Sequence, residues 1–160
     1  MNFKVINTSI GKLTIAAEGG HITHIFFEGE EPDIKIIPDT ETAVLEKAAV
    51  QLTEYFDGHR KVFDLPLKPA GGAFFQKIWK TMIREVTYGA TISYSGLAEL
   101  ADNPKAARAV GMANNRNPIP IIIPCHRVVG KDDKLVGFRA GVCVKEKLLA
   151  FERGEKQWQQ

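Results

Sequence analysis

The segment Pro124-Cys125-His126-Arg127 places a thiol directly beside an imidazole and a guanidinium. Cationic neighbours lower the pKa of a cysteine and enlarge its thiolate fraction, which is the nucleophilic form. We therefore expect Cys125 to attack an electrophilic substrate. Cys143, the second of the two cysteines, has only valines beside it, so we expect it to be a small, buried apolar residue.

Glu152 is a second group that could take part in chemistry. It lies in a helix predicted over residues 142–153, close to Leu148 and Phe151 of the apolar stripe of that helix. A carboxylate beside a buried face needs a partner. Two interpretations are open: a surface ion pair with a neighbouring lysine, or a buried carboxylate that orients His126.

Metal ligands are not expected in this chain. Neither cysteine belongs to a pair or cluster with metal-ligand spacing, and none precedes Cys125. The histidines of the first half, His21, His24 and His59, are expected at the surface or in packing positions. We therefore expect no metal, no disulfide framework and no cofactor.

The elements around Cys125 follow from helical periodicity and from residues that break it. Prolines at positions 118, 120 and 124 interrupt an apolar stretch and predict a rigid, extended segment that leads to the cysteine. Helices are predicted over residues 74–86, 95–101, 105–114 and 142–153. This part of the chain is thus expected to be mainly helical.

Two of these helices, 95–101 and 105–114, form a candidate helix-turn-helix, although any helical domain contains helix pairs. Asn103 is expected to cap the second helix, with Pro104 at its first position. Small side chains line that helix, from Ala106, Ala109, Gly111 and Ala113. These side chains are short enough for the helix backbone to come close to another molecule. Arg108 is the long cationic side chain that projects from this helix.

The first half predicts a small α/β unit. Strands are expected over residues 3–8, 13–17 and 22–28, with hairpin turns at Gly11 and Gly19-Gly20. A helix over residues 44–56 that ends at Gly58, a short strand over 62–65 and a linker over 66–72 follow. We therefore expect an α/β domain of residues 1–72 and a mainly helical domain of residues 73–160.

The composition of the chain, 160 residues with 44% hydrophobic and 25% charged, excludes disordered, collagen-like and low-complexity classes. Its net charge of +2 hides a split, because residues 1–72 carry 7 basic and 11 acidic side chains, whereas residues 73–160 carry 14 and 8. A basic surface concentrates phosphate-bearing partners, so the second half is expected to face nucleic acid. The N-terminus lacks a signal core and no apolar run approaches the roughly 20 residues of a membrane span, so we expect a cytoplasmic, reducing location without membrane contact.

The segment Pro124-Cys125-His126-Arg127-Val128 resembles the active-site signature of the O6-alkylguanine-DNA alkyltransferases, also called methylated-DNA–protein-cysteine methyltransferases. Further segments match in order and spacing: Thr91-Ile92-Ser93-Tyr94, residues 103–111, Asn117-Pro118 and residues 145–152. The resemblance covers residues 74–154 with specific motifs. It implies an RNase H-like α/β domain followed by a helical domain that contains a helix-turn-helix.

The resemblance implies one-time transfer of an alkyl group from O6 of guanine in DNA to Cys125, with O4-alkylthymine as a further candidate lesion. The product is a thioether, which offers no carbonyl for water to attack, so the cysteine is not regenerated. In the family, Glu152 would orient His126, which takes the thiol proton through a bridging water. Tyr94 would donate a proton to the leaving guanine.

DNA contacts are implied in the same way. The lesion would be rotated out of the duplex, with Arg108 entering the base stack from the minor groove. A monomer is expected to bind double-stranded DNA independently of sequence, because phosphate contacts carry no sequence information. The residues expected at the DNA are Lys105, Ala106, Arg108, Ala109, Gly111 and Ala113. Those expected at the substrate pocket or its hinge are Asn117, Val128, Phe138, Arg139 and Ala140.

Two positions depart from the family pattern. Met112 stands where several relatives have a small residue, within the helix expected at the DNA. Ala140 stands where some relatives have tryptophan, which predicts room for alkyl groups larger than methyl.

Other classes remain as alternatives. A lesion-sensing binder of related type would lack the cysteine, and a helix-turn-helix regulator with a structural thiol would bind a particular sequence without a covalent product. A cysteine hydrolase would turn over repeatedly on an acyl substrate.

Overall fold

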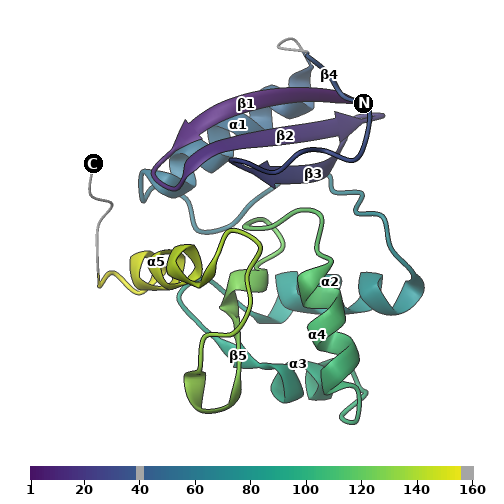
Figure 1. Cartoon of the computed structure of the whole chain (residues 1–160), viewed down its shortest axis with the longest axis vertical. Coiled ribbons are helices and arrows are strands. Elements are labelled where there is room, and N and C mark those ends of the chain that lie inside the picture. The colour runs from purple at the N-terminus through teal and green to yellow at the C-terminus, as the bar shows by residue number, and fades with distance from the viewer. Residues whose placement is uncertain (39–41, 156–160) are drawn as a thin grey trace. The chain divides into compact units, whose positions relative to one another are not determined.

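The computed structural model describes residues 1–38 and 42–155, which form two compact units (Figure 1). One unit contains the described residues from Met1 to Ala70 and the other those from Gly71 onward. The last five residues of the predicted second domain, 156–160, lie outside the described residues.

A four-stranded sheet forms the N-terminal unit, in the order β3-β2-β1-β4. Its strands are β1 (Asn2–Thr8), β2 (Gly11–Glu18), β3 (His21–Phe27) and β4 (Ile37–Pro38). The three long strands pair antiparallel, and β4, which the sequence did not predict, pairs parallel with β1. The predicted turn at Gly19-Gly20 is confirmed, and both glycines have positive φ (58° and 79°), as a tight hairpin requires.

Helix α1 (Ala43–Phe56) packs on this sheet (Figure 1). Leu45, Leu52 and Tyr55 of its apolar stripe are completely buried, as are the strand residues Ile15 and Ile25. The helix ends just before Gly58, whose φ of 81° suits glycine, as the sequence predicted.

The strand predicted over residues 62–65 is wrong. The backbone of Asp64 is hydrogen bonded to the Gln51 side chain instead, which accepts from the Asp64 amide (2.9 Å) and donates to its carbonyl (3.0 Å). The chain joins the sheet edge only further on, through an isolated bridge between Leu67 and Ile22. A helix side chain thus satisfies the backbone that the β-branched pattern had assigned to a strand.

The C-terminal unit is mainly helical, as predicted, and adds a two-stranded parallel sheet. Its α-helices are α2 (Ala73–Glu85), α3 (Tyr94–Leu100), α4 (Ala107–Asn115) and α5 (Val142–Glu152). Its strands are β5 (Ile92–Ser93) and β6 (Val128–Val129), and two short 3-10 segments are η1 (Cys125–Arg127) and η2 (Lys131–Asp133). The helices α2, α3 and α4 pack on one another, and the buried Trp79 indole of α2 donates to the Ala113 carbonyl of α4 (2.9 Å).

Helix α4 begins later than the sequence predicted. The amide of Ala106 donates to the Asn103 carbonyl across a tight turn, so Lys105 and Ala106 precede the helix instead of opening it. Ala106 is the N-cap residue and Asn103 provides no cap. The proline after Asn103 marks this turn, and regular helical bonds start only with Val110, whose amide donates to Ala106.

The segment before Cys125 is also not the extended path that its prolines predicted. Ile121 has a φ of 75°, which is rare for a β-branched residue, and the Ile123 amide donates to the Ile119 carbonyl (2.9 Å). The chain therefore folds back on itself. Burial of Ile119, Ile121 and Ile123, all at most 1% exposed, offsets a backbone strain of about 1–3 kcal/mol.

Candidate active site

Cys125 opens the short segment η1 and is 4% exposed. Its position is fixed by the parallel pairing of β5 with β6, in which Ile92 lies opposite Val128 and Ser93 opposite Val129. Because Tyr94 follows β5 directly and Cys125 precedes β6 by three residues, this pairing brings together two segments that are far apart in the sequence.

Glu152, at the end of α5, is the centre of a buried polar cluster. Its Oε2 lies 2.7 Å from His126 Nε2, and the Arg127 guanidinium donates to Oε1 (2.8 Å) and Oε2 (3.1 Å). The Gly89 amide adds a longer hydrogen bond (3.3 Å). Of the two interpretations left open by the sequence, the geometry matches the buried carboxylate, and the cluster includes an arginine that the sequence did not assign to it.

The Arg127 guanidinium contacts three groups of the protein. Besides Glu152, it donates to the Val86 carbonyl (2.9 Å), and its guanidinium carbon lies 5.7 Å from the centre of the Tyr88 ring. Its side chain is 7% exposed. Such a bidentate arginine is a structural partner of the carboxylate, and the positive charges that lower the pKa of the Cys125 thiol are those of Arg139 and Lys145.

The ionisation of this cluster has a clear direction. Burial alone would raise the pKa of Glu152, but the interactions with His126 and Arg127 together lower it well below its usual range. Burial lowers the pKa of His126 more than Glu152 raises it, so the imidazole is neutral near pH 7. Since a carboxylate only accepts, Nε2 of the neutral ring carries the proton and Nδ1 keeps a free lone pair.

That Nδ1 atom is buried and has no hydrogen-bond partner among the residues described. A neutral imidazole fixed at Nε2 by an ionised carboxylate, with an unprotonated Nδ1, is equipped to accept a proton. Chemically, such a pair can serve as the base and the orienting group beside a nucleophile.

The ionisation of Cys125 contradicts the expectation from its neighbours. Burial raises the pKa of its thiol, and a hydrogen bond with Asn117 and the charges of Arg139 and Lys145 offset this only in part. The imidazole beside it is neutral and the adjacent guanidinium is engaged with a carboxylate, so neither supplies the expected charge. The resting site therefore holds a thiol and needs a base to form the thiolate.

Lys145 carries a buried charge near Cys125, and the sequence did not predict it as a residue of the active site. It is fully buried, and its ammonium donates to the carbonyls of Val128 (2.7 Å), Val136 (3.0 Å) and Gly137 (3.4 Å). Burial lowers its pKa, and the nearby Cys125 raises it. The sequence signal that could have revealed this role is a lysine on the inner face of an amphipathic helix. A charge buried there is costly unless it has hydrogen-bond partners.

Asn117 ties the end of α4 to the cysteine segment. Its amide donates to the Ile123 carbonyl (2.9 Å), and its side-chain oxygen accepts from the Ile119 amide (2.9 Å). Its own carbonyl accepts from Arg139 (2.7 Å), which joins it to the segment 137–141. The residues expected at the pocket or hinge thus lie on connected segments, although Val128 is fully buried.

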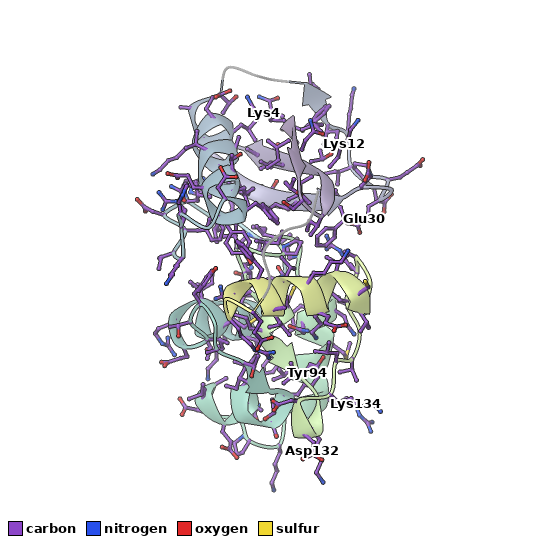
Figure 2. The ribbon with its side chains drawn as sticks, turned by 90° about the vertical axis from the view of Figure 1, so that its left-hand side faces the viewer. Lys4, Lys12, Glu30, Tyr94, Asp132 and Lys134 are labelled. Carbon is purple, nitrogen blue, oxygen red and sulfur yellow. The ribbon has the colours of Figure 1, made fainter. Side chains whose placement is uncertain are left out.

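Tyr94 is the first residue of α3, which is capped by the Ser93 hydroxyl accepting from the Gly96 amide (3.0 Å). Figure 2 shows Tyr94 within the C-terminal unit, whereas Asp132 and Lys134 mark its outer edge. Burial raises the pKa of the phenol; a side-chain hydrogen bond with Asn114 lowers it in part and the charge of Cys125 raises it. The phenol is thus electrostatically coupled to the sulfur.

The residues expected at the DNA divide into two groups. Lys105 and Arg108 are exposed, and Ala106, Ala109 and Gly111 are half-buried. Ala113 is fully buried, so its assignment to the DNA-facing set is wrong. Its backbone carbonyl accepts a hydrogen bond from the Trp79 indole of α2 (2.9 Å), while the neighbouring Met112 is exposed.

Cys143 is exposed in the first turn of α5, so its predicted burial is wrong. The buried face of that helix is formed by Lys145, Leu148, Leu149, Ala150 and Glu152 instead. Within residues 1–38 and 42–155, no three His, Cys, Asp or Glu side chains come together in a way that could hold a metal ion. No helix in this described part is both long and apolar enough to cross a membrane.

Family models match both units. The model for the "6-O-methylguanine DNA methyltransferase, ribonuclease-like domain" matches residues 1–69, and that for the "6-O-methylguanine DNA methyltransferase, DNA binding domain" matches residues 73–154. The chain belongs to the 6-O-methylguanine DNA methyltransferase family. The resemblance seen in the motifs of residues 74–154 is thereby confirmed, and the match extends to residues 1–69, which carry no comparable motif.

Relatives in this family are similar over nearly their full length. A methylated-DNA–protein-cysteine methyltransferase of Haemophilus influenzae is 46% identical over 147 residues, covering 90% of this chain and 82% of that protein. The constitutive methyltransferase of Bacillus subtilis is 41% identical over 157 residues, covering 94% of each. A crystal structure of Mycobacterium tuberculosis OGT in complex with DNA matches with a TM-score of 0.90 at 37% identity, covering 98% of this chain and 96% of that one.

Proposed function

We propose that this protein repairs DNA by transferring a methyl or larger alkyl group from O6 of guanine to Cys125, irreversibly and once per molecule. The observation that carries the proposal is the buried set of Cys125, His126 and Glu152, in a chain that belongs to the 6-O-methylguanine DNA methyltransferase family. The activity is that of a methylated-DNA–protein-cysteine methyltransferase. No cofactor enters the reaction.

The first step is proton removal from the thiol. The proton passes through a water molecule to Nδ1 of His126, whose Nε2–H is held by the ionised Glu152. The imidazolium that forms is stabilised by that carboxylate. The raised pKa of Cys125 supports this order, because the nucleophile is then generated at the moment of reaction and does not persist as a reactive thiolate.

Alkyl transfer then follows as a displacement. The Cys125 sulfur donates an electron pair to the alkyl carbon, the S–C bond forms, and the C–O6 bond breaks with its electron pair remaining on guanine. Tyr94 gives its phenolic proton to the guanine ring, so the base leaves as neutral guanine. The proton held by His126 returns the phenolate to phenol through solvent, which leaves the protein as an S-alkyl thioether.

The helices α3 and α4 are proposed to act as a helix-turn-helix at the minor groove of double-stranded DNA, without sequence preference. Arg108 and Lys105 are exposed there. The short side chains of Ala106 and Ala109, and the absence of one at Gly111, would let the DNA come close to the helix. Arg108 would occupy the stack vacated by the rotated nucleotide. The relative solved in complex with DNA supports contact with DNA itself.

The remaining assignments are also proposals. We assign residues 1–72 to an RNase H-like domain and residues 73–160 to the DNA-binding and alkyl-acceptor domain, in a monomer of the reducing cytoplasm. The substrate pocket is assigned to Asn117, Val128, Phe138, Arg139 and Ala140. O4-alkylthymine is a second candidate substrate.

Mass spectrometry of the protein after incubation with a duplex carrying O6-methylguanine tests the function. One methyl group on Cys125, with a plateau at one per molecule, is expected, and Cys125→Ser is expected to gain none while still binding the duplex. Cys143→Ser is the matched control and should react like the unaltered protein. A folded protein that acquires no methyl group, or one that turns over repeatedly, would refute the proposal.

The small Ala140 side chain motivates a proposal about substrate size. Repair of O6-benzylguanine in DNA is expected to proceed at a rate comparable to that of O6-methylguanine, and Ala140→Trp is expected to slow the benzyl reaction selectively. A strong bias against benzyl in the unaltered protein would exclude a roomy pocket.

A further inference from the structure

Asn114 is a buried amide that neither the sequence motifs nor the reaction described above uses. It lies in the last turn of α4 and is 6% exposed, whereas Asn115, the next residue, is exposed. Buried side-chain amides are retained where they have hydrogen-bonding work, because an unpaired one is costly.

The geometry places Asn114 beside the phenol of Tyr94. A Cβ atom at Gly111 would lie 4.0 Å from Cδ1 and Cε1 of the Tyr94 ring, so the ring lies against α4 at that residue. Asn114 follows Gly111 by three residues and therefore shares its face of the helix. The helices α3 and α4, which carry the two residues, pack directly on one another.

The orientation of the amide follows from its partners. The Asn114 and Tyr94 side chains interact, and this interaction lowers the pKa of the phenol in part. The Oδ1 atom is buried and has no hydrogen-bond partner in the described part of the chain. The NH2 end is thus the one that faces Tyr94.

We infer that Asn114 is a positioning residue for the proton donor Tyr94, an inference that rests on the proposed function. An oxygen that accepts a hydrogen bond from the amide directs its own O–H away from it, toward the base in the pocket. When the phenolic O–H bond breaks, the proton moves to the guanine ring and the electron pair stays on the phenolate oxygen. The same amide donor stabilises that charge.

The experiment compares Asn114→Leu with Asn115→Leu, each alone and combined with Tyr94→Phe. The readouts are the rate of methyl transfer from duplex DNA as a function of pH, the affinity for undamaged duplex, and the rate of Cys125 alkylation by iodoacetamide. Iodoacetamide needs a thiolate but no proton donor for its leaving iodide. It therefore separates support of Tyr94 from general damage to the site.

Asn114→Leu is expected to slow methyl transfer about three- to tenfold and to move the alkaline limb of its pH profile upward. DNA affinity and iodoacetamide reactivity should stay within twofold, and Asn115→Leu should change none of the three. In the Tyr94→Phe background, Asn114→Leu is expected to have no additional effect.

Opposite outcomes are distinguishable. If Tyr94→Phe leaves methyl transfer unchanged, the proposed proton donor is wrong and this inference falls with it. If Tyr94→Phe slows transfer but Asn114→Leu does not, or the two effects multiply, only the inference about Asn114 is overturned. Equal losses of iodoacetamide reactivity and methyl transfer would identify a merely structural residue and would also overturn it.

Discussion

Two regions of the C-terminal unit carry positive charge in opposite ways. Arg127 and Lys145 are buried, and their donors are used by the Glu152 carboxylate and by backbone carbonyls. Lys105 and Arg108, in and after the turn before α4, are exposed. The buried cations stabilise the active site, whereas the exposed cations can interact with a binding partner.

This difference predicts which property each region controls. Buried charges lose their hydration and need nearly ideal partners, so their removal affects stability and chemistry together. Exposed charges keep their hydration and are screened by salt, so their removal affects association with DNA and little else. Substitutions in the two regions should therefore separate stability and chemistry from DNA affinity.

The largest effect is expected for Glu152→Gln. The change leaves the Arg127 guanidinium buried without its carboxylate, which costs about 3–5 kcal/mol in the free energy of unfolding. Urea denaturation measures this loss, and the methyl-transfer rate should fall with it. Glu146→Gln, at an exposed position of the same helix, is the control and should cost less than about 0.5 kcal/mol. A similar cost for both variants would contradict the division.

Arg108→Ala is expected to slow repair in duplex DNA about 30- to 100-fold, because a few kcal/mol of unstacking are no longer offset by the inserted side chain. The much slower reaction with free O6-methylguanine base should be unchanged, since that reaction needs no nucleotide rotation. The test measures, for the same variant, the rate of repair in duplex DNA and the rate of reaction with the free base. Equal losses in both reactions would place Arg108 in the chemistry instead of at the DNA.

Stability is expected to fall on both sides of neutral pH. The pKa of His126 is lowered from 6.5 and that of Glu152 from 4.5, so the unfolded chain binds these protons first as pH drops. The stability from each group is thus lost as pH falls below those ordinary values, by at most about 1.4 kcal/mol per pH unit. On the alkaline side, the raised pKa of Cys125 means that the unfolded chain loses its proton first, so stability declines as pH rises past 9.0.

Urea unfolding across this pH range tests the prediction. His126→Asn is expected to remove the decline that begins near 6.5, and His59→Asn, at an exposed position, is expected to keep it. A decline of unchanged size in His126→Asn would mean that another group is responsible.

The smallest effect is expected for Lys105→Gln. Loss of one phosphate contact should weaken binding uniformly across duplex sequences and reduce the slope of log affinity against log salt by about 1. The free energy of unfolding should not change. Lys12→Gln, at an exposed position of β2, should leave the slope as it is. A salt slope that is equally sensitive to both lysines would indicate diffuse attraction without a defined surface.

Local patterns in the sequence predicted much of the fold. The three long strands, α1, α2, α3 and α5 follow from periodicity and breakers, and the nucleophile follows from a short motif. The start of α4 and the course of residues 117–124 were wrong, because buried isoleucines and a backbone turn outweighed the preferences of proline and asparagine. Propensity is a weak prior where burial decides.

The candidate site was predictable in part. Cys125, His126 and Arg127 are adjacent in the chain. The place of Glu152 on the apolar edge of a helix left open whether it pairs at the surface or orients His126, and the family resemblance implied the second. The roles of Arg127, Lys145 and Asn114 were not predicted. Each depends on a contact across at least one packed interface, and no local spacing reports such a contact.

Local motifs and periodicity were sufficient to indicate the family, the proposed nucleophile and most of the long helices and strands, because these are local properties of the chain. Tertiary structure alone decided the ionisation of the site. It withdraws Cys125 and His126 from water, engages Arg127 with Glu152 and turns Ala113 inward. Desolvation and pairing are set by everything that packs around a group, which is why neighbours in the sequence predicted the wrong direction for the thiol pKa.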